Sequence, residues 1–362
     1  MLNTVITGIP LESLSTPALL LDLDKLEHNL DRMTDYIKDR DCDLRPHIKG
    51  HKNVTIAQMQ IERGAIGVTC AKTTEAEVMI NGGIKNILIA NQVVDENKIE
   101  LLAEMANQAN IMVAVDNLKN CHDLAKIAQK HGTTLGILVE IDVGLGRCGV
   151  KNYQDGVELV KEIMQYNHLD FKGIMAYEGP FRGQRTEEKA PAVRDSLAGA
   201  IKLKELINQE GIDVDIVSCG STGTWNITGE YPGITEIQAG TYPLMETAYL
   251  NDGIPFQPAL FVLASVISKS NDKLVLDAGL KAMTDDQGIP ELADFTAPII
   301  SINEEHSAVK LTEETDKLQI GDRVRIIPAH SCTTVNLYDH YCCVRENIVT
   351  TTWKVHARGK LF

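Results

Sequence analysis

The feature that most constrains the fold is a regular alternation of short aliphatic runs with longer segments of helical spacing, between residues 44 and 239. Eight runs predict strands: Leu44–Lys49, Ile66–Cys70, Asn86–Ala90, Ile111–Asp116, Leu135–Asp142, Phe171–Ala176, Val214–Ser218 and Glu236–Ala239. Such alternation is typical of βα units that build a parallel sheet. Eight units favour a (β/α)8 barrel, although the connections alone also allow an open doubly wound sheet.

The segments between these runs predict helices, because their apolar residues recur three and four positions apart. Examples are Thr73–Asn81, Asn97–Asn107 and Gln154–Tyr166. A further strand, Ala18–Asp22, and a helix, Lys25–Ile37, precede the eight units. These two elements either serve a second domain or close the barrel from below.

Beyond about residue 250 the pattern changes to short strands divided by polar turns. The predicted strands are Leu260–Ser268, Lys273–Leu276, Ala308–Leu311, Arg323–Ile327 and Tyr341–Val344. A length of 362 residues suits two domains. We therefore expect a barrel over residues 1–250 and an antiparallel β-domain over 251–362, with residues 1–24 available to either.

Charge and composition exclude several classes of function. The formal charge of −15, without a cluster of Lys and Arg, argues against a nucleic-acid partner. No apolar run is long enough for a membrane helix, and the N-terminus shows no basic start followed by an apolar stretch, so no leader is predicted. Eight scattered cysteines show neither a zinc-finger spacing nor a disulfide framework. These features predict a cytoplasmic protein with reduced thiols.

The segment RPHIKGHK, residues 45–52, ends the first predicted barrel strand. The carboxyl ends of barrel strands form the catalytic face. A lysine at that edge, Lys49, can be desolvated, which favours the neutral amine that attacks a carbonyl. His47 and His51 flank it as proton carriers. The alternative interpretation is a plain basic loop.

Two loops at the same face are rich in small residues. SCGSTGT, residues 218–224, follows the seventh strand, and AGTY, residues 239–242, follows the eighth. Barrel enzymes often bind phosphate with these two loops. A Gly/Ser/Thr run is in general only a loop, but its place opposite Lys49 favours a phosphate site. Arg147, after the fifth strand, is either a surface ion-pairing residue or a cation over the barrel mouth. Tyr177 and Glu178 end the sixth strand and can supply a phenol or a carboxylate to the same mouth.

The segment PAHSCTTVN, residues 328–336, lies in the predicted β-domain. On an extended segment, residues two apart point to the same side, so His330 and Cys332 can chelate one metal ion. A His-x-Cys pair is in general accidental, and water or substrate must fill the other positions. A thiolate favours zinc over magnesium.

Taken together, these segments resemble the D-threonine aldolase and D-serine dehydratase family, pyridoxal-phosphate enzymes with the alanine-racemase barrel architecture. The resemblance spans nearly the whole chain. It rests on RPHIKGHK, GVTCAKTTEAEV, ILIANQVV, EIDVGLGRCGV, AYEG, TEIQAG, DAGLKAM, EEH and PAHSCTTVNLYD.

The resemblance implies a role for each candidate residue. Lys49 holds pyridoxal 5'-phosphate covalently, and His330 and Cys332 hold a divalent metal, Zn, Mn or Mg, that binds the substrate's β-hydroxyl. The phosphate is cradled by Gly220, Ser221, Thr222, Gly223, Gly240 and Tyr242, and the ring lies near Gln92, Arg147 and Tyr177. A cation near the pyridine nitrogen would keep that nitrogen unprotonated. The architecture also implies a homodimer.

Three positions depart from the family pattern. Gly50 follows the lysine where many relatives have threonine, and Cys219 and Ser221 interrupt the glycine run of the phosphate loop. In the metal pair, the aldolase-like members resemble His-x-Asp, whereas the dehydratase-like members use His-x-Cys. Cys332 therefore points to a dehydratase, while the adjacent TTVNLYD is closer to the aldolases.

Two reactions follow from this constellation. We favour retro-aldol cleavage of a 3-hydroxy-D-amino acid, such as D-threonine or 3-hydroxy-D-aspartate, to glycine and an aldehyde, with His51 as the proton-handling residue. The alternative is dehydration of D-serine or 3-hydroxy-D-aspartate to a keto acid and ammonia. An amino-acid racemase leaves His330 and Cys332 without a role, and non-catalytic cofactor-binding proteins of this kind are single short barrels.

Overall fold

The computed structural model describes residues 7–179, 181–250 and 252–362, which form two compact units. The first, here called the barrel unit, comprises residues 33–49, 56–240 and 360–362; the second, the sheet unit, comprises residues 7–32, 50–55 and 241–359 with Asn251 left out. Residues 1–6 lie outside the described residues, and they begin the N-terminal segment in which the sequence predicts no leader. In the described part, no helix is long and apolar enough to cross a membrane.

The barrel unit is built on eight parallel strands within the described residues. In spatial order they are β3 (Asp43–Leu44), β10 (Glu236–Ile237), β9 (Ile216–Cys219), β8 (Leu169–Ala176), β7 (Leu135–Ile141), β6 (Asn110–Val115), β5 (Asn86–Ile89) and β4 (Val68–Cys70).

The segment that contains β3 closes these strands into a ring. On one side, the Arg45 and His47 N–H groups donate to the Ile237 and Ala239 carbonyls, at 2.9 and 3.3 Å. On the other side, the Ile66 N–H donates to the Leu44 carbonyl at 3.0 Å, and the Ile48 N–H to the Thr69 carbonyl at 2.9 Å. The segment that contains β3 is therefore hydrogen-bonded to the β10 segment on one side and to the β4 segment on the other, which confirms the barrel and excludes the open sheet.

The predicted strand over residues 44–49 is wrong at its C-terminal end. Regular pairing stops at Leu44, and only an isolated bridge between His47 and Thr69 continues it. Pro46 has no N–H to donate to a neighbouring strand, and the chain turns from Ile48 onward. Lys49 consequently lies in a turn and not on a strand.

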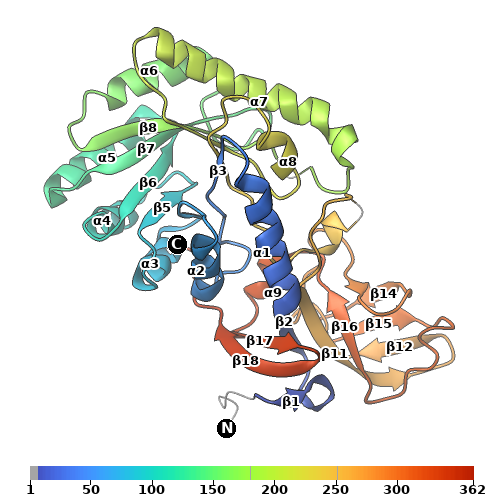
Figure 1. Cartoon of the computed structure of the whole chain (residues 1–362). Helices are drawn as coiled ribbons and strands as arrows, with labels where there is room; N and C mark the ends of the chain where they lie inside the picture. The colour runs from blue at the N-terminus through green and yellow to red at the C-terminus, as the bar shows by residue number, and fades with distance from the viewer. Residues whose placement is uncertain (1–6, 180, 251) are drawn as a thin grey trace. The chain divides into compact units, whose positions relative to one another are not determined.

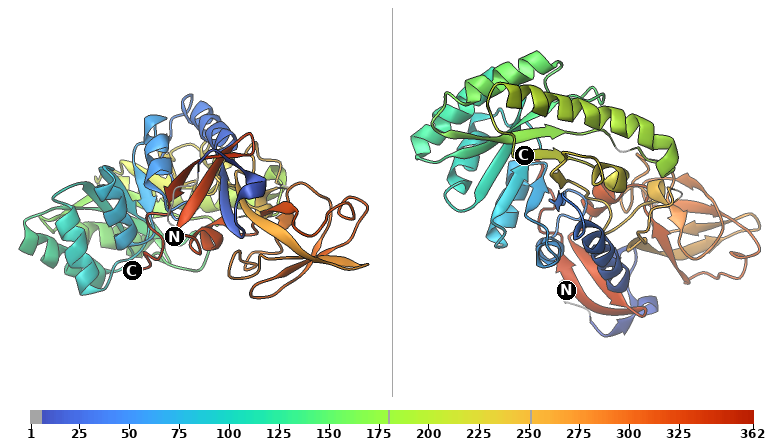
Figure 2. Two further views of the ribbon diagram at one scale, coloured as in Figure 1. Left: turned by 90° about the horizontal axis from the view of Figure 1, so that it is seen from below. Right: turned by 45° about the horizontal axis from the view of Figure 1, so that its top comes forward.

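Helices lie on the outer side of the curved strands (Figures 1 and 2). They are α2 (Val54–Glu62), α3 (Thr73–Asn81), α4 (Glu96–Met105), α5 (Leu118–His131), α6 (Tyr153–Ile163), α7 (Thr186–Gln209) and the short α8 (Trp225–Thr228). On β5 to β8, a separate cluster of buried side chains comprises Leu88, Met112, Ala114, Leu138 and Met175. Because side chains two apart share a face of a strand, Glu140 lies on the same face as Leu138, at the carboxyl end of β7.

The sheet unit holds a ten-stranded, mostly antiparallel sheet within the described residues. Its strands are β1 (Ile9–Pro10), β2 (Ala18–Asp22), β11 (Leu260–Lys269), β12 (Lys273–Leu276), β13 (Glu291–Leu292), β14 (Ile299–Ile302), β15 (Ser307–Lys310), β16 (Arg323–Ile327), β17 (His340–Arg345) and β18 (Ile348–Lys354). Two single-turn 3-10 helices, Leu11–Ser13 and Thr247–Tyr249, and α9 (Ser331–Val335) complete it.

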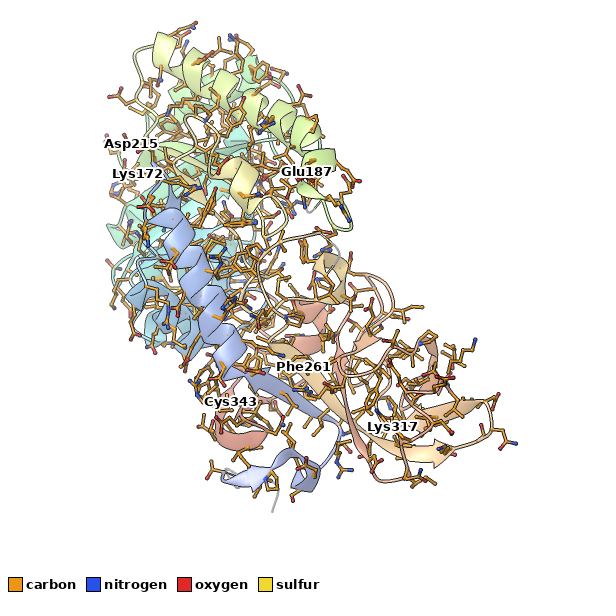
Figure 3. All side chains as sticks on the ribbon, turned by 45° about the vertical axis from the view of Figure 1, so that its right-hand side comes forward. Lys172, Glu187, Asp215, Phe261, Lys317 and Cys343 are labelled. Carbon is orange, nitrogen blue, oxygen red and sulfur yellow. The ribbon has the colours of Figure 1, made fainter. Side chains whose placement is uncertain are left out.

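The N-terminal strand β2 lies in the middle of this sheet. Leu20 pairs with Phe261 of β11 in antiparallel register and with Cys342 of β17 in parallel register. Leu20 and Phe261 belong to one buried apolar cluster with Val349; Figure 3 labels Phe261 and, on β17, Cys343. Of the two alternatives for Ala18–Asp22, the structure selects pairing with the β-rich part of the chain. Helix α1 (Leu23–Ile37) follows directly.

Candidate functional site

Six of the predicted site segments follow the carboxyl ends of strands in the barrel unit. Because parallel strands end at one edge of the ring, their loops share one face. The residues brought to that face are Lys49 after β3, Gln92 after β5, Arg147 after β7, Tyr177 after β8, Gly220–Gly223 after β9 and Gly240 after β10.

Lys49 lies exposed in the turn that follows the His47 bridge. Its backbone N–H donates to His47 Nδ1 at 3.4 Å. The structure therefore places Lys49 in an exposed turn and not at the edge of a strand. Gly240 packs against the same histidine: a Cβ there would lie 2.6 Å from the His47 carbonyl oxygen. This close approach gives Gly240 a packing role besides the predicted phosphate contact.

The loop after β9, residues 220–224 and here called the phosphate loop, has the donors that a phosphate group needs. Ser221 and Thr222 are buried and carry hydroxyls. Gly220 has φ +91°, a left-handed conformation that side chains strongly disfavour. The Ser221 N–H donates to Thr224 Oγ1 at 2.9 Å. The donor set and its position at the barrel mouth fit the phosphate of pyridoxal phosphate.

Beneath the phosphate loop lies Glu178, two residues beyond the end of β8. It accepts hydrogen bonds from the Gly220 N–H at 3.1 Å, Thr224 Oγ1 at 2.6 Å and Thr228 Oγ1 at 2.8 Å. Burial raises the pKa of this carboxyl, and the hydrogen bonds counteract part of that rise. The side chain thus supports the loop, whereas the sequence suggested a carboxylate at the barrel mouth.

A second polar group at the mouth centres on Glu140. Gln92 Nε2 donates to its carboxylate, and Arg147 Nη2 lies 3.8 Å from it. The Arg147 guanidinium also stacks over the Tyr177 ring, 5.3 Å from its centroid. Burial raises the pKa of Glu140, while Gln92 and Arg147 lower it. Glu140 therefore links the three residues predicted to lie near the cofactor ring.

Sequence reasoning missed this role of Glu140, although a signal was present. In LGILVEI, residues 135–141, it is the one charged residue of an otherwise apolar strand that is buried along its whole length. A buried carboxylate in such a strand costs free energy unless it has partners. That cost marks Glu140 as a candidate for function.

The remaining predicted residues lie in the sheet unit. His51 is buried; its Nδ1 accepts from the Asn53 N–H at 3.2 Å, and its carbonyl oxygen accepts from the Tyr341 hydroxyl at 2.6 Å. An accepting Nδ1 places the proton of the neutral ring on Nε2. Neutral His51 is therefore a proton donor in this conformation. Tyr242 is also buried, with its ring 5.5 Å from that of Phe256.

His330 and Cys332 come together in a different way from the one predicted. The extended segment is wrong: His330 is the extended N-cap residue of α9, and Cys332 lies in its first turn. Glu246 holds this turn by accepting from the N–H and the hydroxyl of Ser331, both at 2.8 Å. Cys332 lies close enough to His330 to raise the pKa of its imidazole, so the two proposed ligands are neighbours although neither is on a strand.

Asp286 completes this cluster. Its Oδ2 lies 2.7 Å from His330 Nδ1, and its Oδ1 accepts from the Thr333 hydroxyl at 3.0 Å. Burial lowers the pKa of His330, but Cys332 and Asp286 raise it to about 9. In the described residues, no cluster of three or more His, Cys, Asp and Glu side chains is placed to hold a metal. With Nδ1 engaged, His330 Nε2 and the Cys332 thiol fit a two-ligand site that leaves other positions open.

A lysine and a phosphate loop at the mouth of a closed parallel barrel, on a chain that also builds a mostly antiparallel sheet, define the alanine-racemase-like class of barrel enzymes. Models of two families match the chain: the N-terminal domain of alanine racemase over residues 21–245, and a putative serine dehydratase domain over residues 259–344. The chain belongs to the family that combines these two domains, and it is a pyridoxal-phosphate-dependent lyase.

Individual relatives match almost from end to end. The chain is 37% identical to 3-hydroxy-D-aspartate aldolase of Paracoccus denitrificans (strain Pd 1222), covering 98% of this chain and 94% of that protein. It is 36% identical to D-threonine aldolase of Arthrobacter sp, covering 97% and 95%. The crystal structure of D-threonine aldolase from Filomicrobium marinum superposes with a TM-score of 0.93 at 34% identity, covering 99% of each chain.

Proposed function

We propose that this enzyme cleaves 3-hydroxy-D-amino acids by a retro-aldol reaction, with D-threonine or 3-hydroxy-D-aspartate as substrate and glycine and an aldehyde as products. The observation that carries the proposal is the common position of Lys49, the phosphate loop and the Glu140 group at one end of the barrel. The two aldolases that match nearly the whole chain support this choice of reaction.

Pyridoxal phosphate, when bound, supplies the electron sink for the bond that breaks at the substrate Cα. We assign the residues that hold it as follows. Lys49 would hold the cofactor through its amine, and the phosphate loop with Gly240 and Tyr242 would hold the phosphate. Gln92, Arg147 and Tyr177 contact the ring, and Glu140 holds Gln92 and Arg147 in position. A cation such as Arg147 near the bound ring would disfavour protonation of the pyridine nitrogen.

His330 Nε2 and the Cys332 thiolate are the proposed metal ligands, and a divalent ion there would make a substrate hydroxyl more acidic. The candidates are Zn, Mn and Mg, and the thiolate favours zinc. Asp286 fixes the ring of His330 through Nδ1, as carboxylates commonly do for metal-binding histidines.

His51 is the residue to which we assign the proton transfer at the substrate oxygen. Its Nδ1 is engaged by Asn53, so the exchange takes place at Nε2. In the neutral form Nε2 carries a proton, and accepting one from the substrate requires that the Asn53 bond be released or that this proton be passed on. Histidine is suited to this work near neutral pH.

A dehydratase is the second candidate, and Cys332 is the observation that favours it. The aldolase-like members resemble His-x-Asp at this pair, whereas dehydratase-like members use His-x-Cys. In that reaction Lys49 would take the Cα proton, the β-hydroxyl would leave as water, and a second water would hydrolyse the resulting enamine to a keto acid and ammonia.

A product assay separates the two reactions. Purified enzyme, reconstituted with pyridoxal phosphate and zinc or manganese, is given D-threonine, 3-hydroxy-D-aspartate and D-serine in separate reactions. We expect glycine and an aldehyde from at least one 3-hydroxy substrate. Keto acid and ammonia without glycine would establish the dehydratase, and no turnover of any of the three would refute the proposed substrate class.

Two further proposals are a homodimer, which rests on the resemblance, and a cytoplasmic location, which rests on the sequence features given above. Light scattering coupled to size-exclusion chromatography tests the first, since a homodimer has twice the 39.8 kDa mass of the chain. Fractionation of cells that express the full chain tests the second.

A further inference from the structure

Glu178 lies behind the phosphate loop and is only 5% exposed. Its two carboxylate oxygens have different partners. Oε2 accepts from the Gly220 N–H, whereas Oε1 accepts from the hydroxyls of Thr224 and Thr228. A buried carboxylate with three donors is costly to disturb, because removing it leaves buried polar groups without their acceptor.

The phosphate loop is tied to this carboxylate at two points. The first is the Gly220 N–H, which the left-handed conformation of the glycine turns toward Glu178. The second is Thr224, whose Oγ1 accepts from the Ser221 N–H at 2.9 Å and donates to Glu178 Oε1. Through these contacts Glu178 sets the direction of the first two N–H groups of the loop.

Thr228 offers a useful contrast. It donates to the same oxygen as Thr224, at 2.8 Å against 2.6 Å, but it lies in α8 beyond the loop. Both hydroxyls are buried. Replacing Thr224 removes a contact of the loop, whereas replacing Thr228 removes a buried hydroxyl outside the loop. Comparing the two replacements therefore separates the effect of the loop's shape on cofactor binding from the effect of losing a buried hydroxyl.

We propose that Glu178 is a positioning residue: it holds the phosphate loop in the shape that binds the cofactor phosphate, without touching the phosphate. The inference rests on the proposed function, in which this loop receives that phosphate. It predicts that Glu178 governs affinity for the phosphate group and not for the pyridine ring.

The test compares pyridoxal phosphate with pyridoxal, which lacks the phosphate. Each is titrated into the full-length apoenzyme, and its dissociation constant is measured by absorbance and by fluorescence quenching. For Glu178→Ala we expect affinity for pyridoxal phosphate to fall roughly tenfold or more, as for loss of hydrogen bonds to a charged group. Affinity for pyridoxal should change by less than about threefold.

Conservative variants make the test independent of folding. Glu178→Gln keeps one accepting oxygen and should recover part of the lost affinity. Thr224→Val breaks the link between the Ser221 N–H and Glu178, and it should show the same preference for phosphate as Glu178→Ala. Thr228→Val, the matched control, should keep the ratio of the two dissociation constants within about twofold of the native value. Circular dichroism checks that each variant is folded.

The outcomes separate this inference from the proposed function. If the native enzyme binds pyridoxal phosphate but Thr224→Val and Glu178→Gln leave the ratio unchanged, the inference is wrong and the proposed function stands. The inference is also wrong, and the proposed function also stands, if these variants lose affinity for pyridoxal phosphate and for pyridoxal by the same factor. If the native enzyme binds neither ligand, both are wrong.

Discussion

Single residues at the barrel mouth determine what the fold can do. Lys49 follows a strand that ends early because of Pro46, and Glu140 is buried so that it can hold Gln92 and Arg147. His330 and Cys332 meet at the start of a five-residue helix. Each of these side chains gives a measurable prediction.

Replacing Lys49 with alanine should abolish covalent attachment of the cofactor. Borohydride reduction of the native holoenzyme, followed by digestion and mass spectrometry, should find a pyridoxyl group on the peptide that contains Lys49. In Lys49→Ala the group should be missing and activity should fall by at least about a thousandfold. Lys172→Ala serves as control; this lysine, labelled in Figure 3, pairs with Asp170 at the surface. A modified peptide elsewhere in the native enzyme would refute the assignment.

Replacing Cys332 with aspartate should change metal selectivity. A thiolate prefers zinc, whereas a carboxylate suits manganese and magnesium. We expect the native enzyme to retain zinc in preference to manganese after dialysis against both, and Cys332→Asp to shift that ratio toward manganese. Metal content measured by mass spectrometry gives the result. His330→Ala should lose either metal, and an unchanged ratio in Cys332→Asp would place the metal elsewhere.

The carboxyl group of Glu140 should make stability depend on pH. Burial raises its pKa in the folded state above the ordinary value of 4.5. At pH values between 4.5 and the raised pKa of the folded state, the folded protein binds more protons than the unfolded protein. The contribution of Glu140 to stability therefore falls as the pH rises from 4.5. Glu140→Gln removes this dependence. Urea unfolding of both proteins from pH 4.5 upward should show native stability declining relative to the variant; parallel curves would contradict the assignment.

At the scale of elements, the packing of neighbouring strands leaves no room for some side chains. Gly173, in the middle of β8, has φ +151°, and a Cβ there would lie 2.0 Å from the Ile216 carbonyl oxygen on β9. The pairing of β7 with β8 also shifts register close to this point. A glycine is therefore required at this position of β8.

Gly173→Ala should cost about 2–4 kcal/mol of stability, because the main chain of β9 must move. Gly211→Ala is the matched control: it also has a positive φ, +79°, but a Cβ there meets nothing within 4 Å. Its cost should be only about 1 kcal/mol, from backbone strain. Equal losses in the two variants, measured by chemical unfolding, would show that the contact with Ile216 is unimportant.

At the scale of the whole molecule, the eight parallel strands of the barrel unit close into a ring. The ring of the barrel unit closes beside a buried ion pair, in which Arg45 Nε lies 2.9 Å from Glu236 Oε1 with side chains 3% and 2% exposed. Arg45 also donates to Asn86 Oδ1 on β5 at 2.9 Å. These contacts connect β3, β10 and β5.

Arg45→Met should destabilise the protein by about 3–5 kcal/mol, because it leaves Glu236 buried without its charged partner. Combining it with Glu236→Leu should recover most of that loss. Lys38→Met is the control, since its ion pair with Asp35 is exposed to solvent and its removal should leave the free energy of unfolding almost unchanged. Urea unfolding measures all three, and a small effect of Arg45→Met would mean that the closure does not depend on the pair.

The sequence by itself determined the architecture, whereas the site residues that it named stay predictions. Alternation of strand and helix patterns predicts the barrel. The reason is that burial of one or both faces of a strand, or of one face of a helix, sets the spacing of apolar residues along the chain. Several element bounds are correct to the residue, including Ala18–Asp22, Thr73–Asn81 and Lys273–Leu276. These segments carry strong local signals that tertiary packing reinforces.

The tertiary structure decided what depends on contacts between distant residues. Which sheet takes up β2 follows from its pairing with Phe261 and Cys342, some 240 to 320 positions along the chain. Local pattern cannot show that Glu178 supports the phosphate loop, that Asp286 holds His330, or that Glu246 anchors α9. Hydrogen bonds of this kind are fixed only when the chain has folded and each buried polar group must find a partner.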